Sequence, residues 1–252
     1  MEYEGNIMNK LKAVILAAGK GTRMNSDLPK VIHKCLGQPM VHYVIKAAKD
    51  AGAYDVCVIV GYKAHEVKDA IYDVVDYAEQ TEQLGTGHAV KCALDFIGTE
   101  GDTIVLCGDT PLITGDTLTA LVDQHRKQAN GVTVLSAIVD DATGYGRIIR
   151  NENGEFVKIV EQKDASEEEK QVKEINSGMY IFNSEALSAS LGLLSNDNAA
   201  GEYYLTDTIS LIKKIGLKVS AMPLSGAAVD EIRGVNTMEQ LAEAEKIMSA
   251  RQ

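Results

Sequence analysis

The sequence lacks any long apolar run and any leader-like segment. Charged residues interrupt every apolar stretch before the roughly 20 residues that a membrane-spanning helix needs. Residues 1–12 are polar and have no apolar core followed by a small-residue cleavage site. We therefore expect a soluble cytoplasmic protein without a membrane partner, and a flexible N-terminal extension over residues 1–11.

Cysteine and proline are both scarce, with 4 of each among 252 residues. Cys35, Cys57, Cys92 and Cys107 are far apart and form no C-x-x-C pair. This spacing indicates neither a zinc site nor a disulfide framework, so we expect reduced thiols.

Positive charge is also in short supply. The 25 Lys and Arg residues face 36 Asp and Glu residues, which gives a formal net charge of -11. Nucleic-acid binding relies on clustered basic side chains, so this balance argues against a nucleic-acid partner. A small nucleotide would have to be bound by a few local groups.

What the sequence does contain is an alternation of two periodicities. Short apolar, β-branched runs, which are typical of buried parallel strands, occur at residues 12–18, 55–60, 102–107 and 131–139. Segments of helical length and period lie at residues 40–51, 87–96, 114–129, 205–215 and 237–250. This alternation predicts an α/β protein with a mostly parallel central sheet flanked by helices.

The pattern changes between residues 143 and 183. Shorter strands are predicted at 146–150, 156–161 and 174–182, with the acidic stretch DASEEEKQ between them. We find no internal repeat and no low-complexity linker. The sequence therefore predicts one domain over residues 12–252, with a small β-rich lobe inserted at about 143–183.

The segment 16–30, LAAGKGTRMNSDLPK, has the composition of a phosphate-binding loop. Its small residues allow the backbone N–H groups to approach anionic oxygens. It matches neither the P-loop pattern nor the dinucleotide fingerprint, which needs a glycine where Met24 stands. Arg23 and Lys30 flank the loop and could meet the charge of a triphosphate, or they could be ordinary solvated charges.

Asp109 follows the apolar run TIVLCG at the carboxyl end of a predicted strand. Open α/β sheets bind ligands at this edge, and Mg²⁺ accepts one or two carboxylates beside substrate phosphates. The alternative is that Asp109 only organises the turn and caps the next helix.

A second glycine-containing loop, QLGTGHA at residues 83–89, precedes a predicted helix. Its N–H groups could contact an anion or a base edge. His88 in this loop could be a general base, but transfer to a phosphate nucleophile requires no proton removal, so we favour a structural role.

Nine motifs then appear in order: LAAGKGTRM, SDLPKVIH, EQLGTGHA, GDTPLI, TGYGRI, IVEQKDA, EINSG, GEYYLTD and GVN. In this series the chain resembles the uridyltransferase part of the bacterial bifunctional N-acetylglucosamine-1-phosphate uridyltransferase/glucosamine-1-phosphate acetyltransferase family. The resemblance implies a Rossmann-like nucleotidyltransferase fold. It also implies UMP transfer from UTP to N-acetylglucosamine 1-phosphate, giving UDP-N-acetylglucosamine, a precursor of peptidoglycan and lipopolysaccharide, and pyrophosphate.

The resemblance further implies the roles of individual residues. Arg23 would stabilise the leaving pyrophosphate, Lys30 the α-phosphate, and Mg²⁺ would be held by Asp109 and Asn236. The implied nucleotide contacts are Leu16, Ala17, Ala18, Gly19, Gln80, Gly85, Thr86, Cys107, Gly108 and Asp109. The implied sugar contacts are Gly146, Glu161, Asn176, Tyr204, Thr206 and Asn236.

Two positions, Asn236 and Cys107, differ from the simplest expectation. From the residues alone, Asn236 before a helix is most simply an N-cap, and only the family pattern favours a metal ligand. Cys107 stands where family members can carry a tyrosine, so one contact there can differ.

The β-helix of hexapeptide repeats that follows in the family is not found in the sequence. We accordingly expect no acetyl transfer, either in a monofunctional enzyme or in a chain cut at the domain boundary, and we expect a monomer. Two alternatives stay open: another sugar-1-phosphate nucleotidyltransferase, such as one using glucose 1-phosphate, or a catalytically silent nucleotide-sugar-binding subunit.

Overall fold

The computed structural model describes residues 10–251, so most of the predicted extension lies outside the described residues. The first strand, β1 (Leu11–Ala17), begins one residue before the predicted start of the domain. Within residues 10–251, no helix is both long and apolar enough to cross a bilayer.

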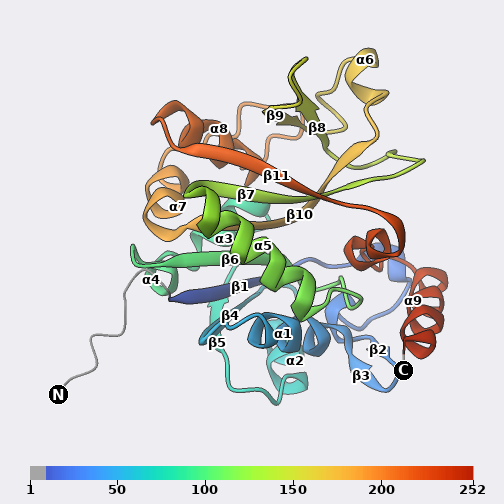
Figure 1. Cartoon of the computed structure of the whole chain (residues 1–252). Helices are drawn as coiled ribbons and strands as arrows, with labels where there is room; N and C mark the ends of the chain where they lie inside the picture. The colour runs from blue at the N-terminus through green and yellow to red at the C-terminus, as the bar shows by residue number, and fades with distance from the viewer. Residues whose placement is uncertain (1–9, 252) are drawn as a thin grey trace.

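A twisted sheet forms the centre of the molecule (Figure 1). Its main path runs in the order β11-β7-β10-β6-β1-β4-β5. The strands are β4 (Asp55–Val60), β5 (Asp76–Glu79), β6 (Asp102–Cys107), β7 (Asn130–Ile138), β10 (Glu174–Asn183) and β11 (Lys218–Leu224). All neighbours are parallel except β10, which pairs antiparallel with both β6 and β7. The predicted mostly parallel sheet is confirmed.

Helices cover both faces of this sheet, because successive residues of its strands point to opposite sides. One apolar cluster joins Ile15 and Leu106 to α1 (Met40–Asp50), α2 (Ala64–Ala70) and α5 (Gly115–Gln128). A second cluster joins Val14 and Val105 to α3 (Thr86–Lys91), α4 (Leu94–Ile97), α7 (Ser184–Leu191) and α8 (Thr206–Lys214). The layered arrangement leaves the carboxyl ends of β1 and β6 free to carry loops.

The segment after β7 contains the three strands predicted for the inserted lobe. Strands β8 (Arg147–Arg150) and β9 (Phe156–Val160) form a hairpin, and α6 (Glu167–Lys170) follows it at the top of Figure 1. The strand predicted at 174–182 joins this hairpin at its start, where Ile175 pairs with Arg147 of β8, and then continues beyond it. It is β10 and lies in the main sheet, because its apolar residues Ile181 and Phe182 are buried between β6 and β7.

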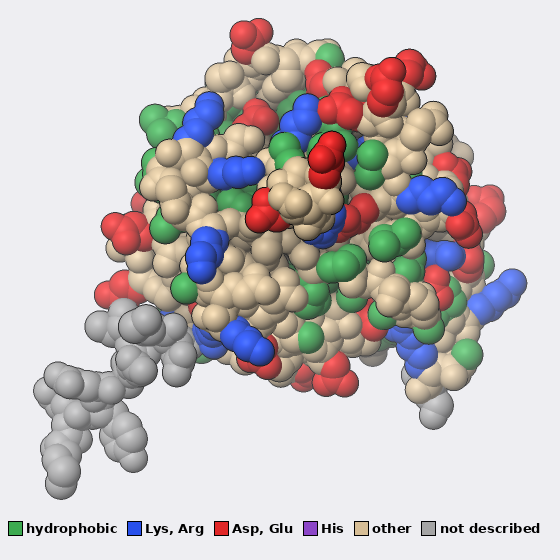
Figure 2. All heavy atoms as spheres, turned by 45° about the horizontal axis from the view of Figure 1, so that its top comes forward, with side chains coloured by type: hydrophobic (Ala, Val, Ile, Leu, Met, Phe, Trp, Pro, Cys, Tyr) green, Lys and Arg blue, Asp and Glu red, His purple; other side chains and the backbone are tan. Residues whose placement is uncertain are grey.

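The C-terminal helix α9 (Met238–Ala250) packs beside the short hairpin of β2 (Lys34–Cys35) and β3 (Gln38–Pro39). A small apolar cluster holds them together and includes Met24, Cys35, Met40 and Leu241. The turn η2 (Thr22–Met24) is thereby anchored next to the segment that leads into α9. On the face shown in Figure 2, Lys and Arg side chains are interspersed with Asp and Glu.

Candidate active site

The loop after β1 brings Lys30 towards the end of the sheet. Gly21 has a left-handed backbone, with φ of 62°, and a Cβ on it would lie 2.4 Å from Cβ of Lys30. A residue with a side chain would therefore collide with the Lys30 stem. The lack of a side chain at Gly21 is therefore required for the close approach of Lys30, whether or not a ligand also needs it.

Lys30 Nζ donates to the carboxylate of Asp109 and, at 2.9 Å, to Oδ1 of Asn236. Nη2 of Arg23 donates to the same Oδ1 at 2.8 Å. Four residues predicted from distant motifs thus form one hydrogen-bonded group. Arg23 is exposed, whereas the side chains of Lys30 and Asp109 are only 16% and 18% exposed, so their ion pair is partly screened from water.

Backbone contacts explain how Asp109 and Asn236 come together. Val235 N donates to the Asp109 carbonyl at 2.8 Å, which aligns the GVN segment along the end of β6. Asn236 N donates to Oε1 of Gln240 at 2.7 Å. Thr237 caps α9, which follows Asn236, and Thr114 caps α5, which follows Asp109. The interpretations of Asn236 and Asp109 as helix caps are therefore wrong.

A cavity of about 350 Å³ opens beside this group between β1, β6 and the loop before α3. Among its lining residues are Leu16, Ala17, Ala18, Gly19, Lys30, Gln80, Gly85, Thr86, Cys107 and Asp109. Gly108 is not among the residues that line it. A Cβ there would lie 2.9 Å from the Leu16 carbonyl, so Gly108 allows β1 and β6 to end side by side.

An adjoining cavity of about 320 Å³ lies on the other side of Asp109. Arg23, Asn236 and Tyr145 contribute to its wall, and Cys107 and Asp109 line both cavities. Burial, followed by the negative charge of Asp109, raises the pKa of the Cys107 thiol to about 12, so the thiol stays protonated at neutral pH. Its Sγ donates to the Gly178 carbonyl at 3.5 Å.

Of the predicted sugar contacts, Gly146, Glu161, Asn176 and Thr206 lie near one another, whereas Asn236 lies beside Arg23 and Lys30. Thr206 Oγ1 donates to Oε1 of Glu161 at 3.1 Å, and a Cβ on Gly146 would lie 3.2 Å from Oε2 of the same carboxylate. Asn176 N donates to the Gly146 carbonyl at 2.9 Å. Burial raises the pKa of Glu161. The carboxylate of Glu161 can accept hydrogen bonds from hydroxyls. Burial, then the charges of Asp164 and Glu161, raise the pKa of the partly buried Tyr204, whose hydroxyl can donate.

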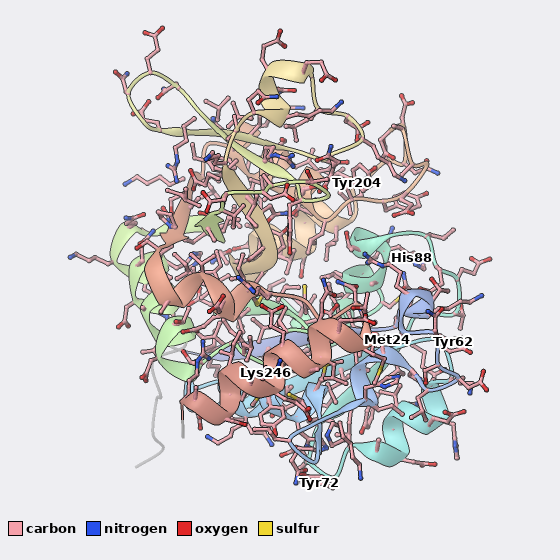
Figure 3. The ribbon with its side chains drawn as sticks, turned by 90° about the vertical axis from the view of Figure 1, so that its right-hand side faces the viewer. Met24, Tyr62, Tyr72, His88, Tyr204 and Lys246 are labelled. Carbon is pink, nitrogen blue, oxygen red and sulfur yellow. The ribbon has the colours of Figure 1, made fainter. Side chains whose placement is uncertain are left out.

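Figure 3 shows Tyr204 above His88 on the same side of the molecule. None of Gly146, Glu161, Asn176 and Thr206 lines either of the two described cavities. The bulge of β10 connects the regions, because Gly178 N donates to Oδ1 of Asn176 at 3.1 Å while its carbonyl faces Cys107.

The sequence model of the family described as "Nucleotidyl transferase" matches residues 12–229 of this chain. The chain belongs to the nucleotidyl transferase family.

Several members of this family are similar over nearly the whole chain. The bifunctional protein GlmU of Caldanaerobacter subterraneus subsp. tengcongensis is 54% identical over 244 residues, which cover 97% of this chain and 53% of that protein. The GlmU of Clostridioides difficile is 51% identical over 240 residues, with coverage of 95% and 52%. The chain thus spans about half the length of the curated relatives it matches.

The fold is also seen in distant solved structures. A UDP-glucose pyrophosphorylase complexed with UDP-glucose superposes with a TM-score of 0.78 at 19% identity, covering 97% of this chain and 100% of that one. At this identity the likeness concerns the fold alone, and it confirms the predicted Rossmann-like architecture of the nucleotidyl transferase.

The donor set of this nucleotidyl transferase fits a shared magnesium ion. Within residues 10–251, no group of three or more His, Cys, Asp and Glu side chains could hold a metal by itself. Asp109 and Asn236 nevertheless direct one carboxylate and one amide oxygen at a single cation, the ammonium of Lys30. Mg²⁺ takes few protein oxygens and completes its shell with water and phosphate, so this pair suits an ion held jointly with a nucleotide.

Some residues of the site were missed from the sequence. Gln83 and Glu202 line the first cavity, and Tyr145 and Gln240 line the second. Gln83, Glu202 and Tyr145 lie inside three of the nine motifs. Predicted site residues in the same motifs could therefore have indicated that these three also line the site. Gln240 lies outside every motif, and only the fold places it against Asn236.

Proposed function

We propose that the chain is a cytoplasmic uridyltransferase that makes UDP-N-acetylglucosamine and pyrophosphate from UTP and N-acetylglucosamine 1-phosphate. The observation that carries the proposal is the convergence of Arg23, Lys30, Asp109 and Asn236 next to a cavity bounded by the LAAG backbone. The family membership and the relatives at about half identity support it.

In this proposal the nucleotide lies along Leu16–Gly19, with its base near Gln80, Gly85 and Thr86. The phosphate of the sugar attacks the α-phosphorus in line with the departing pyrophosphate, and no covalent enzyme intermediate forms. Lys30 stabilises the charge on the α-phosphate, and Arg23 stabilises the charge on pyrophosphate. Positioning and charge stabilisation supply the catalysis in transfers of this kind.

Asp109 and Asn236 would hold Mg²⁺, which supplies charge neutralisation and alignment of phosphate oxygens when it is bound. For their oxygens to do so, Lys30 must turn from both of them, and Arg23 must turn from Asn236, towards the phosphates. Because Gly21 has no side chain, the stem of Lys30 can stay where it is while its ammonium moves.

Glu161 would accept hydrogen bonds from sugar hydroxyls while Thr206 keeps the carboxylate oriented. Asn176 lies on the bulge of β10, where its Nδ2 donates to the Tyr180 hydroxyl at 2.7 Å and its Oδ1 accepts from Gly178 N at 3.1 Å. The second N–H of this amide would donate to the carbonyl of an N-acetyl group. Glucose 1-phosphate lacks that carbonyl and would leave this one donor unsatisfied, which is how a polar site rejects an analogue.

The first test is pyrophosphate release with UTP, Mg²⁺ and N-acetylglucosamine 1-phosphate, beside glucose 1-phosphate and metal-free controls. We expect release only with the N-acetylated sugar, and its loss without metal or in Asp109→Ala. Equal use of glucose 1-phosphate would contradict the substrate and leave a general sugar nucleotidyltransferase. Absence of release under every condition would favour a silent nucleotide-sugar-binding subunit.

A further inference from the structure

The side chain of Gln80 is held from one end only. Gln80 lies at the wall of the nucleotide cavity and is just 3% exposed. Its Nε2 donates to the Gly85 carbonyl at 3.0 Å and lies 3.2 Å from Nδ1 of His88. Both contacts of the amide therefore involve its nitrogen.

The chemistry of these partners fixes which atom is which. A backbone carbonyl can only accept, so the atom that faces Gly85 must be the amide nitrogen. The second N–H of this nitrogen then points at Nδ1 of His88, which must be the acceptor. His88 is accordingly neutral, with its proton on Nε2.

The opposite end of the amide remains available to a ligand. Within residues 10–251, Oε1 of Gln80 has no hydrogen-bond donor, and the fully buried side-chain atoms without a partner are His33 Nε2 and Arg147 Nε. Oε1 thus keeps access to the cavity and presents an acceptor there. Figure 3 shows His88 on α3, facing the region below Tyr204.

We propose that His88 is a positioning residue for base selection: it locks the Gln80 amide so that Oε1 accepts the N3–H of a uracil and opposes a cytosine. Uracil carries a proton on N3, whereas cytosine presents a lone pair at the same atom. Two acceptors facing each other lose a hydrogen bond and leave both groups unsatisfied. This inference rests on the proposed function, which places a uridine nucleotide in this cavity.

The position of the Gln80 backbone does not by itself determine the orientation of its side-chain amide. Gly61 lies against it, and a Cβ there would come within 2.8 Å of the Gln80 carbonyl, so the strand end is tightly packed. The side-chain amide is nonetheless free to rotate about its last bond unless hydrogen bonds prevent it. Gly85 supplies one such bond and His88 the other.

The experiment compares UDP and CDP binding by calorimetry, so that its readout does not require turnover. His88→Leu removes the acceptor, and we expect the preference for UDP over CDP to fall by about three- to tenfold, as for the loss of one hydrogen bond. In His88→Asn the amide oxygen can replace Nδ1, so most of the preference should return. His65→Leu, at an 89% exposed histidine, is the matched control and should leave it unchanged.

A parallel weakening of UDP and CDP in His88→Leu would overturn the proposal, because a merely structural histidine would act on both. A wild type that binds both equally, or an Asn variant no better than the Leu variant, would overturn it too. Pyrophosphate release measured on the same preparations tests the proposed function separately. A protein that selects UDP through His88 yet releases no pyrophosphate would retain this inference and lose that function.

Discussion

Lys30 donates a hydrogen bond from Nζ to Oδ1 of Asn236 at 2.9 Å, across 206 positions of the chain. The same ammonium contacts Asp109, and Arg23 contacts the same amide oxygen. The two oxygens suited to Mg²⁺ are therefore already satisfied by cations of the protein itself. A nucleotide whose phosphates attract both Lys30 and Arg23 would release both oxygens at the moment the phosphates need a metal.

This arrangement predicts the metal affinity of the nucleotide-free protein. Lys30→Met removes the competing charge, so we expect Mn²⁺ to bind about tenfold more tightly while turnover falls about 10²- to 10³-fold. Electron paramagnetic resonance measures free Mn²⁺ directly and gives the affinity without catalysis. Lys46→Met, at an exposed lysine paired with Asp50, is the control. An unchanged Mn²⁺ affinity in Lys30→Met would show that Lys30 does not compete for the site.

Arg23 offers a second prediction, because it is exposed and contributes little to packing. In Arg23→Ala we expect kcat to fall about 10²- to 10³-fold, since a contact to developing charge is lost, while the free energy of unfolding stays within about 0.5 kcal/mol. Arg233→Ala, at a half-exposed arginine paired with Asp230 and Glu243, should retain near wild-type turnover. Turnover and urea unfolding of both variants test this prediction. Full activity in Arg23→Ala would show that Arg23 does not stabilise charge in the transition state.

The central strands could be predicted because they are apolar on both faces. The runs at 12–18, 55–60, 102–107 and 131–139 match β1, β4, β6 and β7 to within one residue at each end. β5 was missed because its sequence DYAE is polar and mostly exposed at the sheet edge. β11 was missed as well, since KVSAMPL mixes polar and apolar residues and carries Pro223 at the opposite edge.

Topology and long-range contacts could not be read from local patterns. The sequence EINSGMYIFN does not indicate that β10 enters the main sheet antiparallel. Its position depends on β6 and β7, which leave a place for one strand between them. Resemblance placed Asn236 in the site, but only the structure gives Thr237 the cap. The contact between Gln80 and His88 depends on the loop between them, whose path no periodicity predicts.

Glu161 gives a prediction that separates sugar binding from chemistry. Glu161→Gln keeps the shape but weakens acceptance of hydroxyl hydrogen bonds, so we expect KM for the sugar phosphate to rise about tenfold with a smaller change in KM for UTP. Thr206→Val, which removes the hydroxyl that orients the carboxylate at 3.1 Å, should act in the same direction and more weakly. Initial rates with either substrate varied measure both constants. An equal rise in both KM values would place Glu161 outside the sugar site.

The last prediction concerns acid stability and lies away from the site. Burial alone would raise the pKa of Asp102, but hydrogen bonds and the positive charges of His125 and Arg126 outweigh it and hold the pKa below its ordinary value of 3.8. Arg126 Nε donates to Oδ2 of Asp102 at 2.8 Å. The unfolded chain therefore takes up the Asp102 proton first as the pH falls. The stabilisation from this group is complete above about pH 4 to 5 and declines as the pH drops through the folded pKa.

Asp102→Asn removes the charge-assisted hydrogen bonds, so at pH 7 it should lower the free energy of unfolding by about 1.5–3 kcal/mol. Because the group that titrates is gone, the variant should lose less further stability than wild type between pH 5 and pH 3. Urea unfolding at several pH values measures both effects. Asp69→Asn, at a 64% exposed aspartate paired with His65, should follow the wild-type curve closely. Parallel pH profiles for wild type and Asp102→Asn would mean that other carboxylates control acid unfolding. If Asp102 contributes, the wild type loses more stability than the variant as the pH falls, so the two curves must converge.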